Sequence, residues 1–448
     1  MSEQAYSPSF INGLYGKLVE GGIGYFFPSA KVELLEPPPD RAIHGLVQVS
    51  ENTLTLNWLG ARYSLSRKEP FSIAELKLLT GIGAVLDTRY RMVVNATLVE
   101  QRFELFRGPV EDRYISASLD VGPYADPDWQ GADRLQDAID VLRTSSLSTY
   151  ENRRISTGAL LFGNHPDPCH ELPITPGGAL RYSSALTSIR SFSRLCDGLR
   201  TLALVDQNGR LVEIVDVEQW AQPFADTSLP VPSAKRYQTH SRATLCGGHI
   251  CMILTPNGEM KIFSEGVQVF HFWNGRWRVT DAQRKYDLWT AAVGNFELAE
   301  RLFATAVNLA EDRRGGLLVV LDHPATAGKL VSRNDLLTTA PSHRELDAAG
   351  TKDQLHYLLH RKSVLDVPEA VLETLARIDG GIVVDAQSNL LAFGAILRHP
   401  DMTDMHPENI EGGRTTAAIS ASRFGNVLKI SEDGMISFFQ KGECVWDI

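Results

Sequence analysis

Hydrophobic and polar side chains follow both strand-like and helix-like patterns in the N-terminal part of the chain. Residues 53–59 alternate apolar and polar side chains, as a half-buried strand does. Residues 71–86 have helical spacing, and Ser72 stands where an N-cap is expected. Residues 91–98 and 114–119 are also predicted to be strands. These patterns predict a mixed α/β structure.

The C-terminal part alternates the two patterns more regularly. Residues 296–311 have the amphipathic spacing of a helix, and residues 316–321 are a nearly continuous apolar run, as in a strand covered on both faces. A helix is predicted at 367–377, with Pro368 in its first turn. Further strands are predicted at residues 382–385, 390–397, 427–430, 435–439 and near Cys444. This order predicts a mixed β-sheet flanked by helices.

Two parts of the chain share the same order of motifs, which indicates an internal repeat. Gly158 stands seven residues before His165-Pro166, and Gly316 stands seven residues before His323-Pro324. Three further pairs follow in the same order: the hairpins at Asp206 and Asp385, residues 241–244 and 413–416, and the turns 255–258 and 431–434. Any one pair could arise by chance, but their shared order favours a duplicated α/β unit.

Loop-like stretches rich in Pro, Asp and Gly suggest where the parts of the chain meet. They lie at residues 122–131 and 222–235, with a less marked one at 280–295. We therefore predict three parts: a mixed α/β N-terminal domain with a candidate sensor role at 1–125, a degenerate copy of the repeated unit at 130–282, and the second copy at 295–448.

Composition narrows the classes of function. The chain has 448 residues, 43% hydrophobic content and a net charge of −10, which argues against a basic groove for a nucleic acid polymer. The five cysteines have no metal-ligand spacing and are expected to be thiols in a reducing compartment. No apolar run reaches the length of a membrane span, and the N-terminus has no signal pattern. We expect a soluble, cytoplasmic protein that does not contact a membrane.

The second copy carries the candidate chemistry. Asp379 precedes Gly380 and Gly381 at the start of a predicted strand. A carboxylate can hold a divalent cation and help to deprotonate a hydroxyl, and glycines allow a ligand to approach the backbone. An Asp-Gly pair alone is more often an ordinary turn, and the neighbouring motifs favour the functional interpretation.

Arg414 follows Gly413 at the start of a predicted helix. Its guanidinium can bind phosphate oxygens in a bidentate manner, and a helix N-terminus favours anions. The hydroxyls of Thr415 and Thr416 can donate to phosphate or cap the helix.

Ser431 and Glu432 lie in a predicted hairpin turn. They could supply a hydroxyl and a second metal ligand, or form the turn only.

From residue 295 to the C-terminus, these motifs resemble the diadenylate cyclase family. The family's Asp-Gly-Ala is similar to residues 379–381, its Gly-Thr-Arg-His-Arg-Ala-Ala to residues 412–418, and its Val-Ser-Glu-Glu-Thr-Gly turn to residues 430–434. The resemblance implies a mixed sheet with helices on both faces. It also implies that two such domains meet face to face, each holding one ATP, and form a cyclic dinucleotide with Mg²⁺ or Mn²⁺. The residues implied are Asp379 and Arg414 for catalysis, Gly380, Gly381, Gly413, Arg414, Thr415, Thr416 and Ser431 for nucleotide binding, and Asp379 and Glu432 for the metal.

The chain departs from the family at one motif. Where the family has Arg-His-Arg, this sequence has Arg414-Thr415-Thr416, so a cation and an imidazole are missing. A hydrogen bond to a charged group contributes about 1.5–3 kcal/mol, so another cation should replace them in an active enzyme. Lys329 and Arg333 are candidate substitutes. The departure leaves the base open, and the product could be cyclic or linear.

Two functions follow from these observations. The first is a nucleotidyltransferase that joins two nucleoside triphosphates into a dinucleotide signal, regulated by its N-terminal region and self-associating through its cyclase-like domains. The alternative is an inactive nucleotide sensor that regulates an effector protein. A role in stress signalling or antiviral defence rests on family analogy. His165, His240 and His323 are expected to be structural, and residues 270–278 to form a hairpin with a packed aromatic face.

Overall fold

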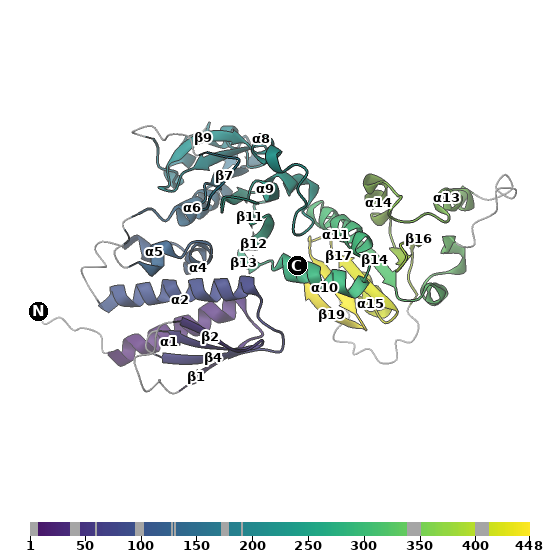
Figure 1. Cartoon of the computed structure of the whole chain (residues 1–448), viewed down its shortest axis with the longest axis horizontal. Helices are drawn as coiled ribbons and strands as arrows, with labels where there is room; N and C mark the ends of the chain where they lie inside the picture. The colour runs from purple at the N-terminus through teal and green to yellow at the C-terminus, as the bar shows by residue number, and fades with distance from the viewer. Residues whose placement is uncertain are drawn as a thin grey trace, which may run out of the picture. The chain divides into compact units, whose positions relative to one another are not determined.

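The computed structural model shows a mixed α/β protein that divides into two compact units (Figure 1). Unit 1 comprises Met1–Ser228 and Thr239–Asp281, and unit 2 comprises Leu229–Gln238 and Ala282–Ile448. The structure describes residues 8–35, 45–58, 61–94, 103–126, 129, 131–171, 179–189, 191–337, 351–398 and 412–448. Among these residues, no helix combines the length and apolar character needed to cross a membrane.

Unit 1 begins with a four-stranded antiparallel sheet of order β1-β4-β3-β2 and two long helices. Helix α2 starts with a capping box: the Ser72 hydroxyl accepts from the Glu75 N–H at 3.2 Å, and the Glu75 carboxylate accepts from the Ser72 N–H at 2.8 Å. The predicted cap, helix and strand at 53–59 are confirmed. The elements are α1 (Pro8–Phe26), β1 (Lys31–Leu35), β2 (Gly45–Ser50), β3 (Thr53–Trp58), β4 (Ala61–Ser66) and α2 (Ile73–Val94).

Two predicted strands of this region are wrong. Residues 91–94 continue α2, residues 95–98 lie outside the described residues, and 114–119 belong to helix α4 (Val110–Leu119). Tyr114 and Ile115 of α4 are buried, and α4 packs on α2. An aromatic and β-branched run suits a buried helix face as well as a strand, and the tertiary packing decides between them.

A seven-stranded sheet of order β13-β12-β11-β10-β7-β8-β9 completes unit 1. Strands β7 and β8 are parallel and the other neighbours are antiparallel. The predicted hairpin at 270–278 is confirmed as β12 and β13, with Trp277 buried. The strands are β7 (Thr157–Leu161), β8 (Thr201–Val205), β9 (Leu211–Asp216), β10 (Ile250–Leu254), β11 (Met260–Ser264), β12 (Val267–Trp273) and β13 (Arg276–Val279), with the two-residue pair β5 (Thr149–Tyr150) and β6 (Arg153–Arg154) nearby in sequence. The helices are α5 (Gly122–Ala125), α6 (Arg134–Ser146), α7 (Phe192–Leu195), α8 (Val217–Ala221) and α9 (Gln238–Arg242).

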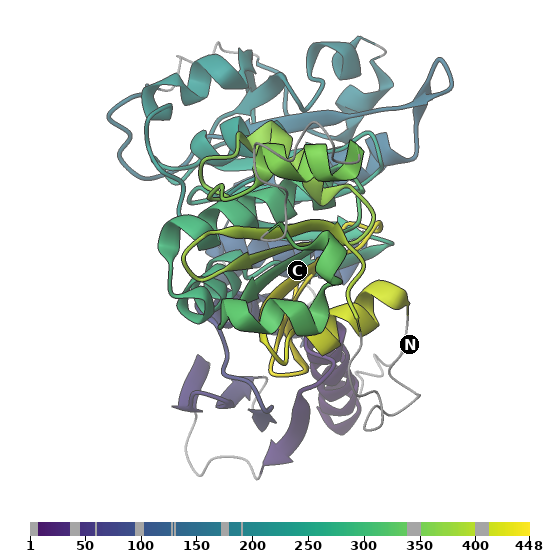
Figure 2. The ribbon, with the colours of Figure 1, turned by 90° about the vertical axis from the view of Figure 1, so that its right-hand side faces the viewer.

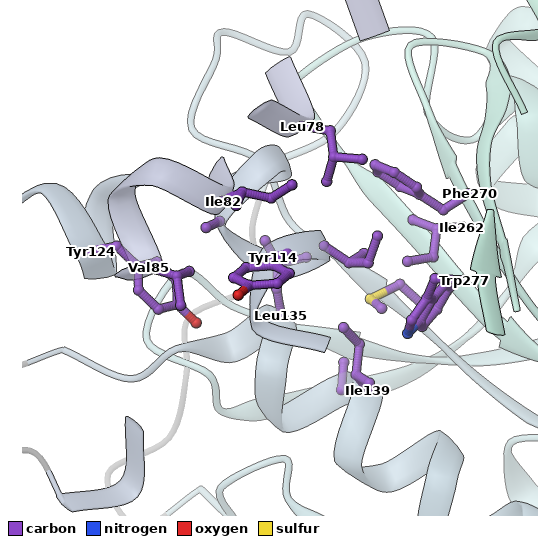
Figure 3. Close-up of a cluster of buried hydrophobic side chains, with 14 of the residues drawn as sticks. Leu78, Ile82, Val85, Tyr114, Tyr124, Leu135, Ile139, Ile262, Phe270 and Trp277 are labelled. Carbon is purple, nitrogen blue, oxygen red and sulfur yellow. The ribbon is translucent and has the colours of Figure 1, made fainter. Parts of the chain in front are cut away.

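One hydrophobic core joins the two parts predicted at 1–125 and 130–282. Figure 3 shows Ile82 of α2, Tyr114 of α4, Ile139 of α6 and Phe270 of β12 in the same buried cluster. Helix α4 packs on both α2 and α6, and α6 packs on β7 and β10. The two parts therefore lie in one compact unit, and their division into separate domains stays a prediction.

Unit 2 is a mixed six-stranded sheet of order β16-β15-β14-β17-β18-β19 with helices on both faces (Figure 2). The β14–β15 pair is parallel and the other pairs are antiparallel. Helices α11 and α14 pack on one side of β14, whereas α15 and α12 share a core with Leu317 and Val319 on the other. The strands are β14 (Gly316–Leu321), β15 (Gly381–Asp385), β16 (Leu390–Ala395), β17 (Gly425–Ile430), β18 (Ile436–Gln440) and β19 (Glu443–Asp447). The helices are α10 (Ala282–Val293), α11 (Phe296–Glu311), α12 (Ala327–Leu330), α13 (Thr351–Leu359), α14 (Glu369–Ala376) and α15 (Gly413–Ala421).

The sheets of the two units have the same topology apart from the additional β13. The order β9-β8-β7-β10-β11-β12 corresponds to β16-β15-β14-β17-β18-β19, with one parallel pair at the same place in each. The turns agree as well: Asp206 and Asp385 each accept, through one carboxylate oxygen, the N–H groups of the residues two and four positions later. These shared features support the predicted duplication.

The strand registers correct the predicted pairing of the two copies. Thr157 lies opposite Leu254, which directly precedes the turn at 255–258. Gly316 lies opposite Ile430, which directly precedes the corresponding turn at 431–434. Thr157, rather than Gly158, is therefore the counterpart of Gly316.

The helices that precede β10 and β17 are also offset from the predicted pairing. The hydroxyl of Thr244 accepts from the Gly266 N–H, and that of Ser422 accepts from the Gly442 N–H, both at 3.0 Å. Thr244 therefore corresponds to Ser422. Arg242 lies at the end of its helix and is not the counterpart of Arg414.

Candidate functional site

The predicted site residues of unit 2 gather at one edge of its sheet. Because β14 and β15 are parallel and β17 is antiparallel to β14, the beginnings of the first two strands meet the end of the third. Gly315 directly precedes β14, Asp379 and Gly380 precede β15, and Ser431 follows β17. Three segments far apart in the sequence therefore reach the same edge.

Asp379 presents a free acidic group at this edge. The residue is exposed, and its carboxylate makes no hydrogen bond or ion pair with the residues that the structure describes. An exposed carboxylate without a protein partner can accept a metal ion or a proton at little cost in protein contacts.

Gly380 has a structural role beside this carboxylate. Its φ is +111°, and a Cβ there would lie 2.6 Å from the carbonyl carbon of Gly394 on β16. Glycine is therefore needed where β15 meets the β16 backbone, whereas the prediction attributed it to the approach of a ligand. A Cβ at Gly381 would meet only ordinary contacts, with the Leu317 carbonyl oxygen 3.4 Å away. Nucleotide binding by Gly380 and Gly381 stays a prediction.

Arg414 reaches the same edge from α15. Helix α15 starts after Gly412, whose φ is +82°. The Arg414 guanidinium lies against Gly315, where a Cβ would be 2.1 Å from Nη1. Arg414 also donates to Glu432 Oε1 at 2.9 Å. The side chains of this pair are 41% and 71% exposed, so the ion pair is weak and can open for another anion.

Of the remaining predicted site residues, some have no described hydrogen-bond partner and others already contact the protein. Gly413 is exposed, and the Ser431 side chain is half-buried without a protein partner among the described residues. Thr415 Oγ1 accepts from the Lys429 ammonium at 3.2 Å. Thr416 is buried, and its hydroxyl donates to the Gly412 carbonyl at 3.4 Å; Gly412 is the N-cap residue, so the alternative prediction that Thr416 caps the helix is wrong.

The cation beside the first turn of α15 was not foreseen. Lys329 lies over the ring of Phe424, with Nζ 5.7 Å from its centroid, and Phe424 is at the opposite end of β17 from Ser431. Lys429 is the lysine that contacts Thr415. Its position two residues before Ser431 on the same strand was a usable signal in the sequence. The sequence also predicts a surface loop beside the site at residues 338–352; residues 338–350 lie outside the described residues, and 351–352 begin helix α13.

The corresponding edge of unit 1 is closed. A Cβ at Gly198 would lie 2.5 Å from the Thr157 carbonyl oxygen, so the chain packs against the start of β7. Asp197 Oδ1 accepts from the N–H groups of the next residues, at 2.8 Å from Leu199 and 2.7 Å from Arg200. Burial raises the pKa of Asp197, but these backbone hydrogen bonds outweigh it and lower the pKa overall. Asp197 Oδ1 therefore closes a turn, and the interpretation of this unit as a degenerate copy stays a prediction.

Unit 1 contains a buried cluster that sequence reasoning missed. Asp167 Oδ2 lies 2.9 Å from His170 Nδ1 and 2.7 Å from His249 Nε2, and these atoms are close enough to be considered as metal ligands. His249 is far from the other two residues in sequence, so no local spacing indicated the cluster.

The hydrogen bonds of the cluster argue against a metal. His249 Nδ1 accepts from the Gly163 N–H at 2.9 Å, so Nε2 carries the ring proton and donates it to Asp167. Metal-bound histidines normally donate from the other ring nitrogen. Although burial raises the pKa of Asp167, hydrogen bonds from Cys169, His249 and His170 lower it to about 2. The cluster is therefore a hydrogen-bonded structural network.

A buried histidine of unit 1 gives its stability a defined pH dependence. Burial lowers the pKa of His240 from 6.5 to about 4, although its hydrogen bond to the Gly198 carbonyl opposes the shift. The unfolded chain takes up this proton near pH 6.5 and the folded chain near pH 4, so the stabilisation is full above pH 6.5 and is lost as the pH falls to 4. The expected loss is about 3 kcal/mol.

The matched variant is His240→Gln, whose amide can donate to Gly198 without titrating. Urea unfolding of unit 1 between pH 7 and pH 4 measures both proteins. The free energy of unfolding of the wild type should fall more steeply than that of the variant, and parallel curves would show that His240 does not contribute.

No protein-family model and no curated protein matches the sequence. Among solved structures, a hypothetical membrane spanning protein from Bacillus cereus is 18% identical, with 38% of this chain and 76% of that chain covered and a TM-score of 0.24. A double mutant of DacA from Staphylococcus aureus is 19% identical, with 34% of this chain and 87% of that chain covered and a TM-score of 0.21. TM-scores this low do not establish a shared fold.

Proposed function

We propose that unit 2 is a nucleotidyltransferase that joins two nucleoside triphosphates into a cyclic or linear dinucleotide and releases pyrophosphate. The observation that carries the proposal is the edge shared by β14, β15 and β17. There Asp379, whose carboxylate has no partner among the residues that the structure describes, accompanies the Arg414 guanidinium, which is held by a weak, exposed ion pair. An acid and a cation at one open edge are what phosphoryl transfer requires for deprotonation and charge stabilisation.

The residues present fit a divalent cation at Asp379. Its carboxylate is exposed and has no described partner, whereas Glu432 is paired with Arg414 at 2.9 Å. Asp379 would therefore hold Mg²⁺ or Mn²⁺, and Glu432 could join it through its other oxygen, because only Oε1 is paired with Arg414. When bound, the ion would offset the negative charge of the phosphates.

The proposed reaction assigns a role to each side chain. The 3′-hydroxyl of one nucleotide attacks the α-phosphorus of the other, and the bond between the α-phosphorus and the bridging oxygen breaks as pyrophosphate leaves. Asp379 takes up the hydroxyl proton or passes it to solvent. Arg414 binds phosphate oxygens and stabilises the charge that develops on them.

Another copy of unit 2 supplies the second nucleotide in this proposal. The corresponding edge of unit 1 differs, because Gly198 packs on Thr157 and Asp197 Oδ1 accepts from the backbone N–H groups of the following turn. The proposal therefore requires self-association during turnover.

The test is to incubate the full chain with each nucleoside triphosphate and Mn²⁺ or Mg²⁺, and to measure pyrophosphate and dinucleotides. The proposal expects both products from at least one nucleotide. Tight nucleotide binding without turnover would favour the alternative function, an inactive sensor. Neither binding nor turnover with any nucleotide would contradict both.

A further inference from the structure

Lys429 is a half-buried cation at the proposed site. It lies on β17 two residues after Val427, so both side chains point to the face that α15 covers. The Lys429 ammonium donates to Thr415 Oγ1 at 3.2 Å and lies 5.8 Å from the centroid of the Phe439 ring. Ser431, two residues further along, follows on the same face at the edge of the sheet.

The charges around Lys429 do not balance. Among the described residues, no carboxylate lies within ion-pair distance of its ammonium, and the nearby Glu432 is already paired with Arg414. Lys235, a lysine of the same unit, instead has Glu369 at 3.3 Å and Glu373 at 2.9 Å. An ammonium that has lost part of its hydration shell to a hydroxyl and an aromatic ring gains more from an anion.

We propose that Lys429 binds the polyphosphate chain of a nucleoside triphosphate, together with Arg414. This inference rests on the proposed function and adds a specific residue and a ligand group to it. Arg414 and Lys429 both lie beside the first turn of α15, so the oxygens of one polyphosphate chain can accept hydrogen bonds from both cations. The same contact would stabilise the pyrophosphate as it leaves.

The experiment measures binding of inorganic tripolyphosphate to the full chain by calorimetry, alongside turnover. The variants are Lys429→Met, which keeps most of the side-chain length without the charge, and Lys429→Arg, which keeps the charge. Lys362→Met is the matched control, because Lys362 is exposed and its ammonium has no described partner. Thermal unfolding confirms that each variant is folded.

We expect Lys429→Met to weaken tripolyphosphate binding about tenfold or more, and Lys429→Arg and Lys362→Met to change it by less than about threefold. Unchanged binding by folded Lys429→Met would overturn the proposal for Lys429, whatever the turnover. Wild-type binding that depends on Lys429, without turnover, would retain Lys429 as an anion ligand and reject the transfer reaction. No binding by the wild type would reject both.

Discussion

Replacing Asp379 with Asn should lower the rate of dinucleotide formation by about 1,000-fold or more, equivalent to about 4 kcal/mol of transition-state stabilisation. The amide has nearly the same shape as the carboxylate but can neither take up the hydroxyl proton nor hold a divalent cation well. The fold should be unaffected, because the Asp379 side chain is exposed and makes no contact that the variant could break among the described residues. Pyrophosphate release under saturating nucleotide and Mn²⁺ measures the effect.

The matched control is Asp366→Asn. Asp366 is also an exposed aspartate of unit 2, and its carboxylate has no described partner, but it lies away from the starts of β14 and β15 in sequence. The rate of dinucleotide formation by Asp366→Asn should stay within about twofold of the wild-type rate. If Asp379→Asn and Asp366→Asn had the same rate, Asp379 would have no part in the reaction.

The second large effect concerns stability. Gly380→Ala should destabilise unit 2 by about 3 kcal/mol or more, because its φ of +111° is unfavourable for alanine and the new methyl would lie 2.6 Å from the carbonyl carbon of Gly394. The contact is with backbone, which cannot rotate away as a side chain can. The measurement is the midpoint of unit 2 unfolding in denaturant, followed for example by the fluorescence of Trp289 and Trp446.

Gly328→Ala is the control for this substitution. Gly328 lies in α12, and a Cβ there would meet no atom within 4 Å. Its unfolding midpoint should stay at or slightly above that of the wild type, because alanine favours helix over glycine. If Gly380→Ala were as stable as the wild type, the backbones at Gly380 and Gly394 would have to move apart without loss of stability, which would contradict this account.

The strands of unit 2 and helices α11 and α14 were predicted well because each has one unambiguous pattern, whereas the loop-like stretch predicted at 280–295 is wrong, since it contains helix α10. The run 316–321 is buried throughout as β14, and Asn295 caps α11 by accepting from the Leu298 N–H at 3.2 Å. In unit 1, the segments 91–94 and 114–119 were mistaken for strands. Their apolar side chains serve a core shared with distant strands such as β12, and local propensity contains no information about that packing.

The site was predicted only as a set of motifs. Sequence order could indicate Asp379 and Arg414, but not the Gly315 backbone on which the guanidinium rests, because that contact depends on the register of β14 and the start of α15. The contact between Lys429 and Thr415 likewise depends on which face of β17 meets the helix. The cluster of Asp167, His170 and His249 joins residues that lie far apart in the sequence of unit 1. No short sequence motif therefore indicates it.

The central claim is that the edge at Asp379 and Arg414 binds a nucleoside triphosphate and a metal ion. A crystal structure of the full chain with Mn²⁺ and a non-hydrolysable nucleoside triphosphate analogue tests it most directly. We expect an anomalous Mn²⁺ peak at coordination distance from the Asp379 carboxylate, with phosphate oxygens on Arg414. A fully occupied nucleotide bound elsewhere, with Asp379 and Arg414 contacting neither metal nor phosphate, would contradict the claim.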